Sequence, residues 1–175
     1  MAADGSVIID TRMDTSGVQN GVSAIKKSFN GLGSAVKKIG LLIGGAFAVG
    51  KFVQFGKECV ELGLKAAKPW GHLGDIAYAI NSHAQENGYS VVEEIGGHGI
   101  GLEFHEEPFV SYVTPKGSEM VLVPGMMFTI EPMINQGSPE FYVDEDNGWT
   151  VYTDDDGLSA QIEYMVLIKE EVGGQ

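Results

Sequence analysis

The sequence has one cysteine, few basic residues and no long hydrophobic run, and each shortage excludes a class of protein. Cys59 alone cannot form an internal disulfide, which fits a reducing compartment. There are 11 Lys and Arg against 24 Asp and Glu, and the formal net charge of −13 argues against nucleic acid as a main partner. The most apolar stretch, residues 39–50, is shorter than the roughly 20 residues that span a bilayer. We therefore expect no membrane span and no signal peptide. A buried helix segment is the favoured interpretation of this stretch, and an interfacial helix is the alternative.

Charge and residue types are distributed unevenly along the chain. Residues 1–63 hold seven basic and five acidic residues, whereas residues 64–175 hold four basic and nineteen acidic ones. All prolines, histidines and tryptophans lie in the second part. A shift of this kind is typical of a domain boundary or of a joint between pieces of different origin. The sequence therefore predicts two parts, 1–63 and 64–175.

The first part is predicted to be a short strand followed by a long amphipathic helix. Strand-forming residues occupy positions 7–9, and turn and N-cap residues follow at 14–17. Apolar residues then recur in alternating steps of four and three at Val18, Val22, Ile25, Phe29, Leu32, Val36 and Ile39. This pattern is typical of a helix that packs along another helix, so a homo-oligomer formed through this segment is possible.

The second part is predicted to be α+β. A helix is expected to begin within 71–75, with Asp75 as a possible N-cap, and to end at Gly88. Five runs have the composition of strands: 89–93, 109–113, 126–134, 149–153 and 160–168. The acidic runs 144–146 and 154–156 lack EF-hand spacing, which favours solvated loops over calcium sites.

Three segments hold residues that can carry chemistry. His98 and His105 lie in GGHGIGLEFHEEP, which we interpret as a glycine-rich loop; it lacks the HExxH pattern of helical zinc proteases. Glu131 in FTIEPM and Glu163 in SAQIEYMVLI each interrupt an apolar run, where a carboxylate is costly unless it has a partner. Two carboxylates and an imidazole suit manganese, iron, cobalt or zinc in a hydrolytic site. The alternative is that the glutamates face solvent and the histidines are simply exposed.

The segments LKAAKPWGHLGDIAYAI, GGHGIGLEFHEEP, VPGMMFTIEPM, GWTV and LSAQIEYMVLI occur in this order between residues 64 and 168. Together they closely resemble the C-terminal half of a bacterial type I methionine aminopeptidase. The resemblance implies half of a pita-bread fold, a curved and mostly antiparallel sheet with helix. It also implies removal of the initiator methionine from new proteins with two divalent metal ions.

The resemblance assigns roles to four residues. His98, Glu131 and Glu163 match metal ligands, and Glu131 also matches a proposed general base. His105 matches a catalytic histidine that contacts the substrate and helps to stabilise the reacting carbonyl. The family draws two further metal-binding aspartates and a substrate-contacting histidine from its N-terminal half, which has no matching context here. The resemblance therefore implies at most one metal ion (Mn, Co, Fe or Zn) and weak or absent activity.

The first part resembles something else. The segments SVIIDTRMDTSGVQNGVSAIKKSFNGLGSAVKKIG and AFAVGKFVQFGKECVELG are similar to the start of a phage tail tape measure protein. Three functions therefore stay open for the chain: a metalloaminopeptidase by descent, a structural assembly protein, and a non-functional fusion remnant. A cytoplasmic location is expected from the aminopeptidase resemblance, and a virion tail is the alternative.

Overall fold

The structure, a computed structural model, describes residues 36–170. The chain divides after Gly45 into two compact units. Of the first unit, the structure describes only residues 36–45, which form the start of a helix. The predicted strand and most of the predicted seven-residue repeat fall outside the described residues. The predicted boundary between residues 63 and 64 falls inside a helix and stays a prediction. Among the described residues, no helix combines the length and apolar character that crossing a bilayer requires.

Two helices, α2 (Val36–Ala66) and α3 (Leu73–Glu86), precede the strands. Helix α3 begins after His72, so Asp75 is the third residue of the helix and not its N-cap, contrary to the sequence-based expectation. Its carboxylate accepts a hydrogen bond from the His72 backbone N–H at 2.9 Å, as the glutamate of a capping box does. Gly88 follows the end of the helix with φ +76°, which confirms the predicted stop.

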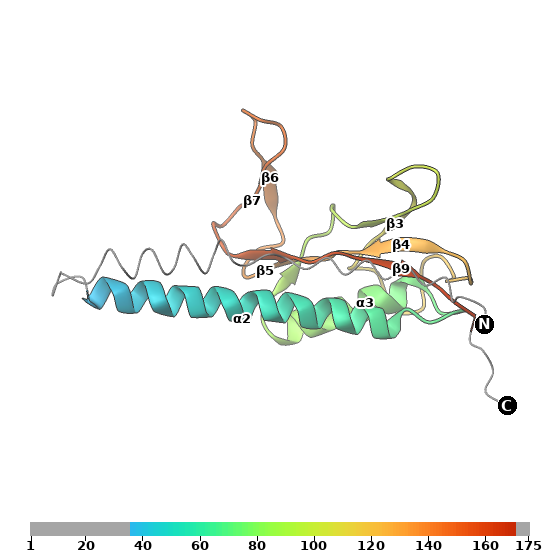
Figure 1. Cartoon of the computed structure of the whole chain (residues 1–175), viewed down its shortest axis with the longest axis horizontal. Coiled ribbons are helices and arrows are strands. Elements are labelled where there is room, and N and C mark those ends of the chain that lie inside the picture. The colour runs from blue at the N-terminus through green and yellow to red at the C-terminus, as the bar shows by residue number, and fades with distance from the viewer. Residues whose placement is uncertain (1–35, 171–175) are drawn as a thin grey trace, which may run out of the picture. The chain divides into compact units, whose positions relative to one another are not determined.

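Nine short strands follow the helices among the described residues, and all their pairings are antiparallel. They are β1 (Ser90–Val91), β2 (Gly97–Gly99), β3 (Glu106–Val110), β4 (Met127–Ile130), β5 (Met133–Asn135), β6 (Phe141–Val143), β7 (Val151–Thr153), β8 (Ser159–Gln161) and β9 (Tyr164–Leu167). They form sheets of order β1-β5-β8 and β3-β2-β4-β9 and the hairpin β6–β7 (Figure 1). This mixed antiparallel architecture confirms the predicted α+β class. Each predicted run overlaps a strand, whereas β2 and β6 were not predicted.

The two larger sheets share one antiparallel ladder. Ile130 of β4 pairs with Tyr164 of β9, and Met133 of β5 pairs with Gln161 of β8. Two residues separate the paired positions on each side, so the register continues from one sheet into the other. We call residues 126–135 and 159–168 the shared ladder.

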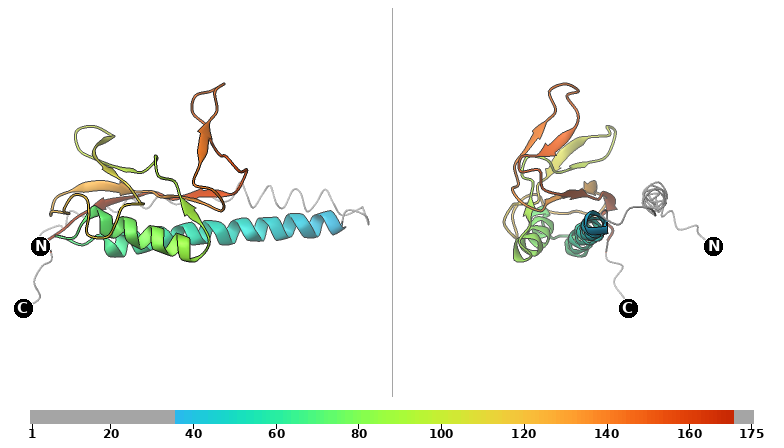
Figure 2. Two further views of the ribbon diagram at one scale, coloured as in Figure 1. Left: turned by 180° about the vertical axis from the view of Figure 1, so that it is seen from behind. Right: turned by 90° about the vertical axis from the view of Figure 1, so that its left-hand side faces the viewer.

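One face of the shared ladder packs on the helices. Phe128, Ile130 and Ile134 are fully buried together with residues of α3 and the second half of α2. Figures 1 and 2 show α3 and the second half of α2 along this face of the ladder. At Gly56 of α2, an added Cβ would lie 3.4 Å from the Ala160 Cβ. The buried members of this core are Phe52, Cys59, Val60, Leu73, Ile76, Ile80, Ala84, Val91, Val110, Tyr112, Leu122, Phe128, Ile130, Ile134, Ala160 and Ile168.

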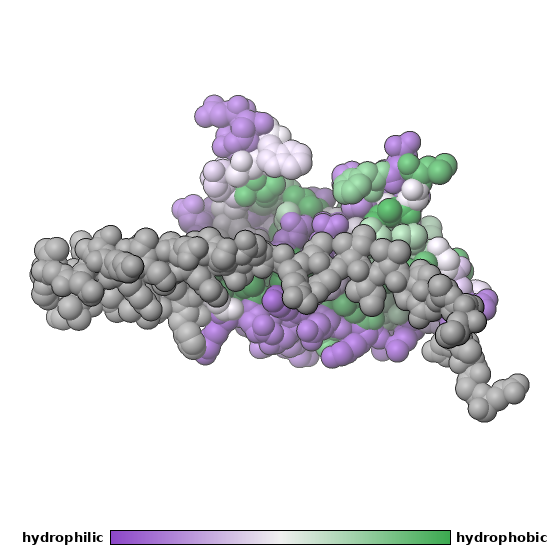
Figure 3. All heavy atoms as spheres, viewed as in Figure 1, coloured by the Kyte–Doolittle hydropathy of each residue, from purple (hydrophilic) through white to green (hydrophobic). Residues whose placement is uncertain are grey.

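Hydrophobic side chains stay exposed on two projecting segments. Leu102 and Phe104 on the β2–β3 loop are exposed, as are Tyr142 and Trp149 on the β6–β7 hairpin. In Figure 3, hydrophobic (green) side chains lie over the β2–β3 loop and at the base of the hairpin, whose outer part is purple and white. These segments leave the ladder on the side away from the helices (Figure 2).

Candidate metal centre

His98 lies in strand β2 and not on a glycine-rich loop, which corrects the sequence-based interpretation. Strand β2 is a central strand between β3 and β4. A Cβ at Gly97 would meet the Thr129 carbonyl oxygen, and one at Gly99 would meet the Glu107 carbonyl. Glycine usually weakens a strand, but here it permits close approach of neighbouring backbones. Because Gly97 and Gly99 have no side chains, the two neighbouring strands pack closely on either side of His98.

The two candidate glutamates are opposite each other in the shared ladder. The pairs Ile130–Tyr164 and Met133–Gln161 bracket them, so Glu131 faces Glu163 in the continuing register. Side chains that are directly opposite in an antiparallel pair lie on the same face, with Cβ atoms about 4.5–5.5 Å apart. The pairing thus brings together two carboxylates that are 32 positions apart in the sequence.

His98, Glu131 and Glu163 form one group. Each offers a ligand atom, and these atoms all lie within 4.8 Å of one another. The Nε2 of His98 is 3.5 Å from the Oε1 of Glu131. The side chains of His98 and Glu131 are 15% and 13% exposed, whereas Glu163 is exposed. The group is therefore half-buried and open on the Glu163 side.

The hydrogen bond of His98 fixes its tautomer. Its Nδ1 is 2.9 Å from the Gly99 carbonyl oxygen, which can only accept a hydrogen bond. Nδ1 must therefore carry the proton in this contact, and in the neutral ring the lone pair is on Nε2. Ligating histidines commonly donate their other ring N–H in this way. The geometry directs the free lone pair of Nε2 toward Glu131.

Thr129 connects the histidine strand to the Glu131 carboxylate. Its Oγ1 donates to the Glu131 Oε1 at 2.6 Å and accepts from the His98 backbone N–H at 2.9 Å. The residue is 1% exposed, so water does not compete for these bonds. Side chains two residues apart on a strand lie on the same face. The motif FTIEPM, read as a strand, therefore already indicated that Thr129 lies beside Glu131.

Two further residues hold the same glutamate. The buried Tyr112 hydroxyl accepts from the Glu131 backbone N–H at 2.7 Å and donates to the Thr129 carbonyl oxygen at 3.5 Å. The Gln161 side-chain amide donates to the Glu131 Oε2 at 3.2 Å. Sequence reasoning missed both residues, since Tyr112 lies in a separate segment and Gln161 is identified only by the strand pairing.

The pKa of the Glu131 carboxyl is raised above its ordinary value of 4.5. Burial is the main cause, and the nearby Glu163 carboxylate adds to the increase. The hydrogen bond from Thr129 opposes the increase, as do His98 and His105 when their rings are protonated. Ionised Glu131 is therefore poorly compensated by the protein alone, which is the electrostatic condition that favours a bound cation.

His105 is beside the group but is not one of its three members. It lies on the exposed loop before β3, and its ring centroid is 4.2 Å from that of His98. The other two histidines are elsewhere: His72 precedes α3, and His83 stacks on Phe55 at 4.8 Å. Neither histidine is a member of the group.

The acidic runs around the β6–β7 hairpin do not add a second cluster. In the part of the chain that the structure describes, His98, Glu131 and Glu163 are the group that meets metal-ligand geometry. Asp155 accepts hydrogen bonds from the backbone N–H groups of Ser138 and Gly157. Its carboxylate thus organises a turn.

Comparison with known proteins identifies the family of this chain. The sequence profile of metallopeptidase family M24 matches residues 41–170. This chain belongs to metallopeptidase family M24. It is 46% identical over 121 residues to methionine aminopeptidase A of Synechocystis, covering 69% of this chain and 47% of the relative. It is 39% identical over 150 residues to methionine aminopeptidase of Escherichia coli, covering 85% of this chain and 55% of the relative.

Solved structures of methionine aminopeptidases agree with this chain in fold. Methionine aminopeptidase from Rickettsia prowazekii superposes with a TM-score of 0.68 at 38% identity, covering 70% of this chain and 50% of that one. The Thermotoga maritima enzyme superposes with a TM-score of 0.65 at 36% identity, covering 69% and 48%. The chain therefore spans about half the length of these relatives.

Proposed function

We propose that this chain carries the metal-binding half of a methionine aminopeptidase-type site, which acts on the N-terminal methionine of peptides and new proteins. The observation that supports it is the convergence of His98, Glu131 and Glu163 in a chain of the M24 family. We infer that these three residues hold one divalent cation, and that Mn, Co, Fe and Zn are the candidate ions.

The three residues fit a cation on chemical grounds. They provide an imidazole nitrogen with a free lone pair and two carboxylates that share a small space. Two carboxylates this close repel each other, and a cation between them removes the repulsion. When bound, such an ion supplies polarisation of a carbonyl and activation of water.

The protein groups around the site have separate tasks in this proposal. Thr129 and Tyr112 hold Glu131 in place, and Glu131 is the group that takes up a proton during hydrolysis. His105 lies on an exposed loop beside the ligands, where it is placed to donate a hydrogen bond to the carbonyl of a bound peptide. We expect weak or absent turnover, because the two further aspartates that the resemblance implies have no counterpart in this chain.

Titration calorimetry with Mn²⁺ or Co²⁺ tests the proposal. The wild type should bind one ion, and Glu163→Ala should weaken binding by at least roughly tenfold, the lower end of what even an outer-shell partner contributes. Glu86→Ala, at the exposed end of α3, is the matched control that should leave the affinity unchanged. Equal affinities for wild type and Glu163→Ala would contradict the proposal.

Release of methionine from a Met-Ala-Ser peptide is measured in the same buffer. Binding of two ions with turnover that is lost in Glu163→Ala means that other residues complete the site. Binding of one ion without turnover means that the chain retains the metal ligands but does not release methionine. Binding of no ion leaves the structural and remnant interpretations.

A further inference from the structure

Strand β9 is the last strand of its sheet, and only β4 pairs with it among the described residues. Ile168, which follows β9, shows which backbone groups face β4. Its N–H donates to the Met126 carbonyl oxygen at 3.0 Å, and its own carbonyl oxygen accepts from the Gly125 N–H at 2.8 Å. Backbone groups point to alternate sides along a strand, so those of Met165 and Leu167 point away from β4. No described residue bonds to these outward donors and acceptors.

The outer edge of β9 is apolar and exposed. Met165 is 51% exposed and Leu167 is 48% exposed, on the face of the ladder that carries Glu163. Residues 164–168 include neither a charged residue nor a proline. Natural proteins protect edge strands with such residues, because an unpaired apolar edge is a template for a further strand. The edge of β9 lacks this protection and is therefore suited to pairing with another strand.

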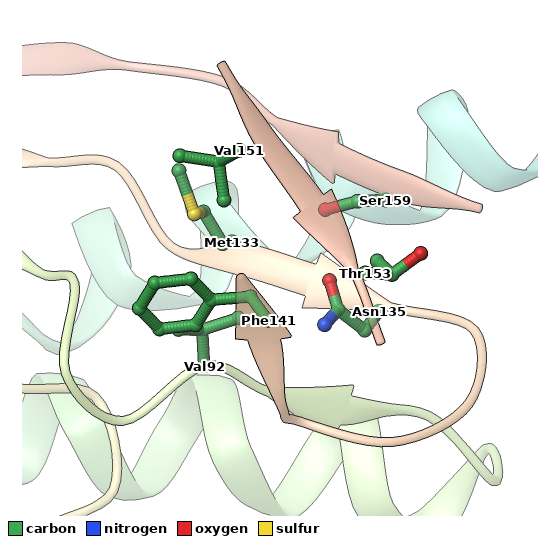
Figure 4. A pocket seen from close by; sticks show the side chains of 7 residues that line it. All are labelled: Val92, Met133, Asn135, Phe141, Val151, Thr153 and Ser159. Carbon is green, nitrogen blue, oxygen red and sulfur yellow. The ribbon is translucent and has the colours of Figure 1, made fainter. Parts of the chain in front are cut away.

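The exposed apolar part of the ladder's outer edge is confined to β9. At the other end of the ladder, Ser159 and Gln161 are the exposed residues of β8, and both are polar. Phe141 and Val151 of the β6–β7 hairpin line a small pocket at that end, together with Met133 and Ser159 (Figure 4). A further strand would therefore bury exposed apolar side chains along β9 and not along β8.

A second copy of β9 matches this edge in one particular register. In an antiparallel pair, hydrogen bonds join residues whose backbone groups point toward each other, so Met165 of one copy can pair with Leu167 of the other. The same register places Glu163 opposite Lys169 and Val166 opposite itself. A shift of two residues in either direction places Glu163 opposite Leu167, or Lys169 opposite Met165. This register therefore joins opposite charges and also matches apolar residues with apolar ones.

We propose that β9 pairs with β9 of a second copy of this chain, antiparallel and in this register, to form a two-fold dimer. Apolar and oppositely charged pairs across two strands stabilise such a contact. Both copies use the same edge, so the contact closes and leaves no β9 edge free for a third copy. This surface differs from the seven-residue repeat of residues 18–39. The contact does not depend on the proposed metal function, because no metal ion takes part in the pairing.

Analytical ultracentrifugation of the full chain in buffer with EDTA tests the dimer. We expect a mass of two chains at high concentration and of one chain on dilution. Leu167→Lys should abolish the dimer, because it places a charge on the paired edge. Val143→Lys is the matched control, since Val143 is 42% exposed on the hairpin strand β6 and should leave the dimer unchanged. A wild type that is monomeric at every concentration overturns the proposal, and so does an assembly that grows beyond two chains.

Cysteine cross-linking tests the register. The two Val166 residues would form a pair without hydrogen bonds, with Cα atoms about 4.5 Å apart, which suits a disulfide. Met165 would be offset from its own copy by two residues, at about 8 Å, which is too far. Oxidised Val166→Cys should therefore give a covalent dimer and Met165→Cys should not, with buried Cys59 as the common background. Equal cross-linking of the two variants, or none in Val166→Cys, overturns the proposal.

A charge exchange tests the same register without cross-linking. Lys169→Glu should raise the dissociation constant of the dimer about fivefold, because each dimer then holds two pairs of like charges. The double variant Glu163→Lys with Lys169→Glu should restore the wild-type value. EDTA removes metal ions that would otherwise compete for Glu163. A double variant that dimerises as weakly as Lys169→Glu alone contradicts the register.

Hydrogen exchange identifies what covers the edge. In the proposed dimer, exchange of the Met165 and Leu167 amides should slow as the protein concentration rises. Protection of both amides in a monomer would mean that another segment of the chain covers the edge, which overturns the proposal. Phe29→Lys interrupts the seven-residue repeat and should leave the dimer intact. A dimer that is lost in Phe29→Lys and retained in Leu167→Lys would assign the contact to the repeat, which also overturns the proposal.

Discussion

The two faces of the shared ladder differ in what they do. On the helix-facing side, Phe128, Ile130 and Ile134 are fully buried and apolar. On the other side, the intervening residues are Met127, Thr129, Glu131, Met133 and Asn135, which include one candidate ligand, Glu131, and its hydrogen-bond donor Thr129. Because side chains alternate along a strand, one short segment serves the core and the site in alternate positions.

Residues that stabilise the core therefore alternate with residues that form the candidate site along the same strands. A substitution on the helix-facing side should unfold the ladder without touching the ligands. One on the opposite side should alter binding while the core remains packed. The following predictions test this separation, in order of decreasing effect.

The largest effect is expected at the core. Phe128→Ala should lower the free energy of unfolding by about 3–5 kcal/mol, because it leaves a cavity where a fully buried ring packs. Its neighbour Met127, on the opposite face and 38% exposed, should change stability by no more than about 0.5 kcal/mol on Met127→Ala. Urea unfolding measures both. Comparable losses in the free energy of unfolding for the two variants would contradict the difference between the two faces.

The second effect concerns metal affinity. Thr129→Val keeps the shape of the side chain but removes the hydrogen bond to Glu131, so Mn²⁺ affinity in calorimetry should fall roughly 10–100-fold. Thr129→Ser retains the hydroxyl and should restore most of the affinity. If Thr129→Ser binds as weakly as Thr129→Val, the hydroxyl is not what positions the carboxylate.

A smaller effect distinguishes two glycines of α2. Gly56→Ala should stabilise the protein by about 0.5–1 kcal/mol, because the new Cβ makes ordinary contacts with Ala160 and Ile162. Gly63→Ala should not, since its Cβ would come within 2.8 Å of the Ile80 Cδ1 in the tight α2–α3 contact. Thermal unfolding of the two variants checks the order. Equal stabilisation would show that α3 moves aside readily.

The smallest effect is a pH dependence at the hairpin. Backbone hydrogen bonds from Ser138 and Gly157 lower the pKa of Asp155 below its ordinary value of 3.8. The ionised carboxylate therefore adds stability above the ordinary pKa, and this contribution disappears as the pH falls through the lowered pKa. Asp155→Ala should lower the Tm at pH 7 and converge with the wild type in acid. Asp154→Ala is the neighbouring control, and a Tm gap that widens on acidification would reverse the assigned sign.

Much of this arrangement was predictable from the sequence, for physical reasons that also explain the failures. Glu131 and Glu163 stand out because a carboxylate in an apolar run needs a partner, but which partner depends on a pairing that no local pattern encodes. Strand β2 was missed because glycine has low strand propensity, and its need for glycine arises from its neighbours. Tyr112 acts through a hydroxyl that reaches Glu131 from 19 positions away. The tape-measure resemblance of residues 1–63 stays a prediction.

The position of the hairpin has a consequence for how this protein can change. Pairing of Asn135 with Ser159 closes the ladder before the chain enters the β6–β7 hairpin. Insertions or deletions within the hairpin therefore leave Glu131 opposite Glu163. The hairpin is thus free to change in length and sequence while the carboxylate pair stays in place.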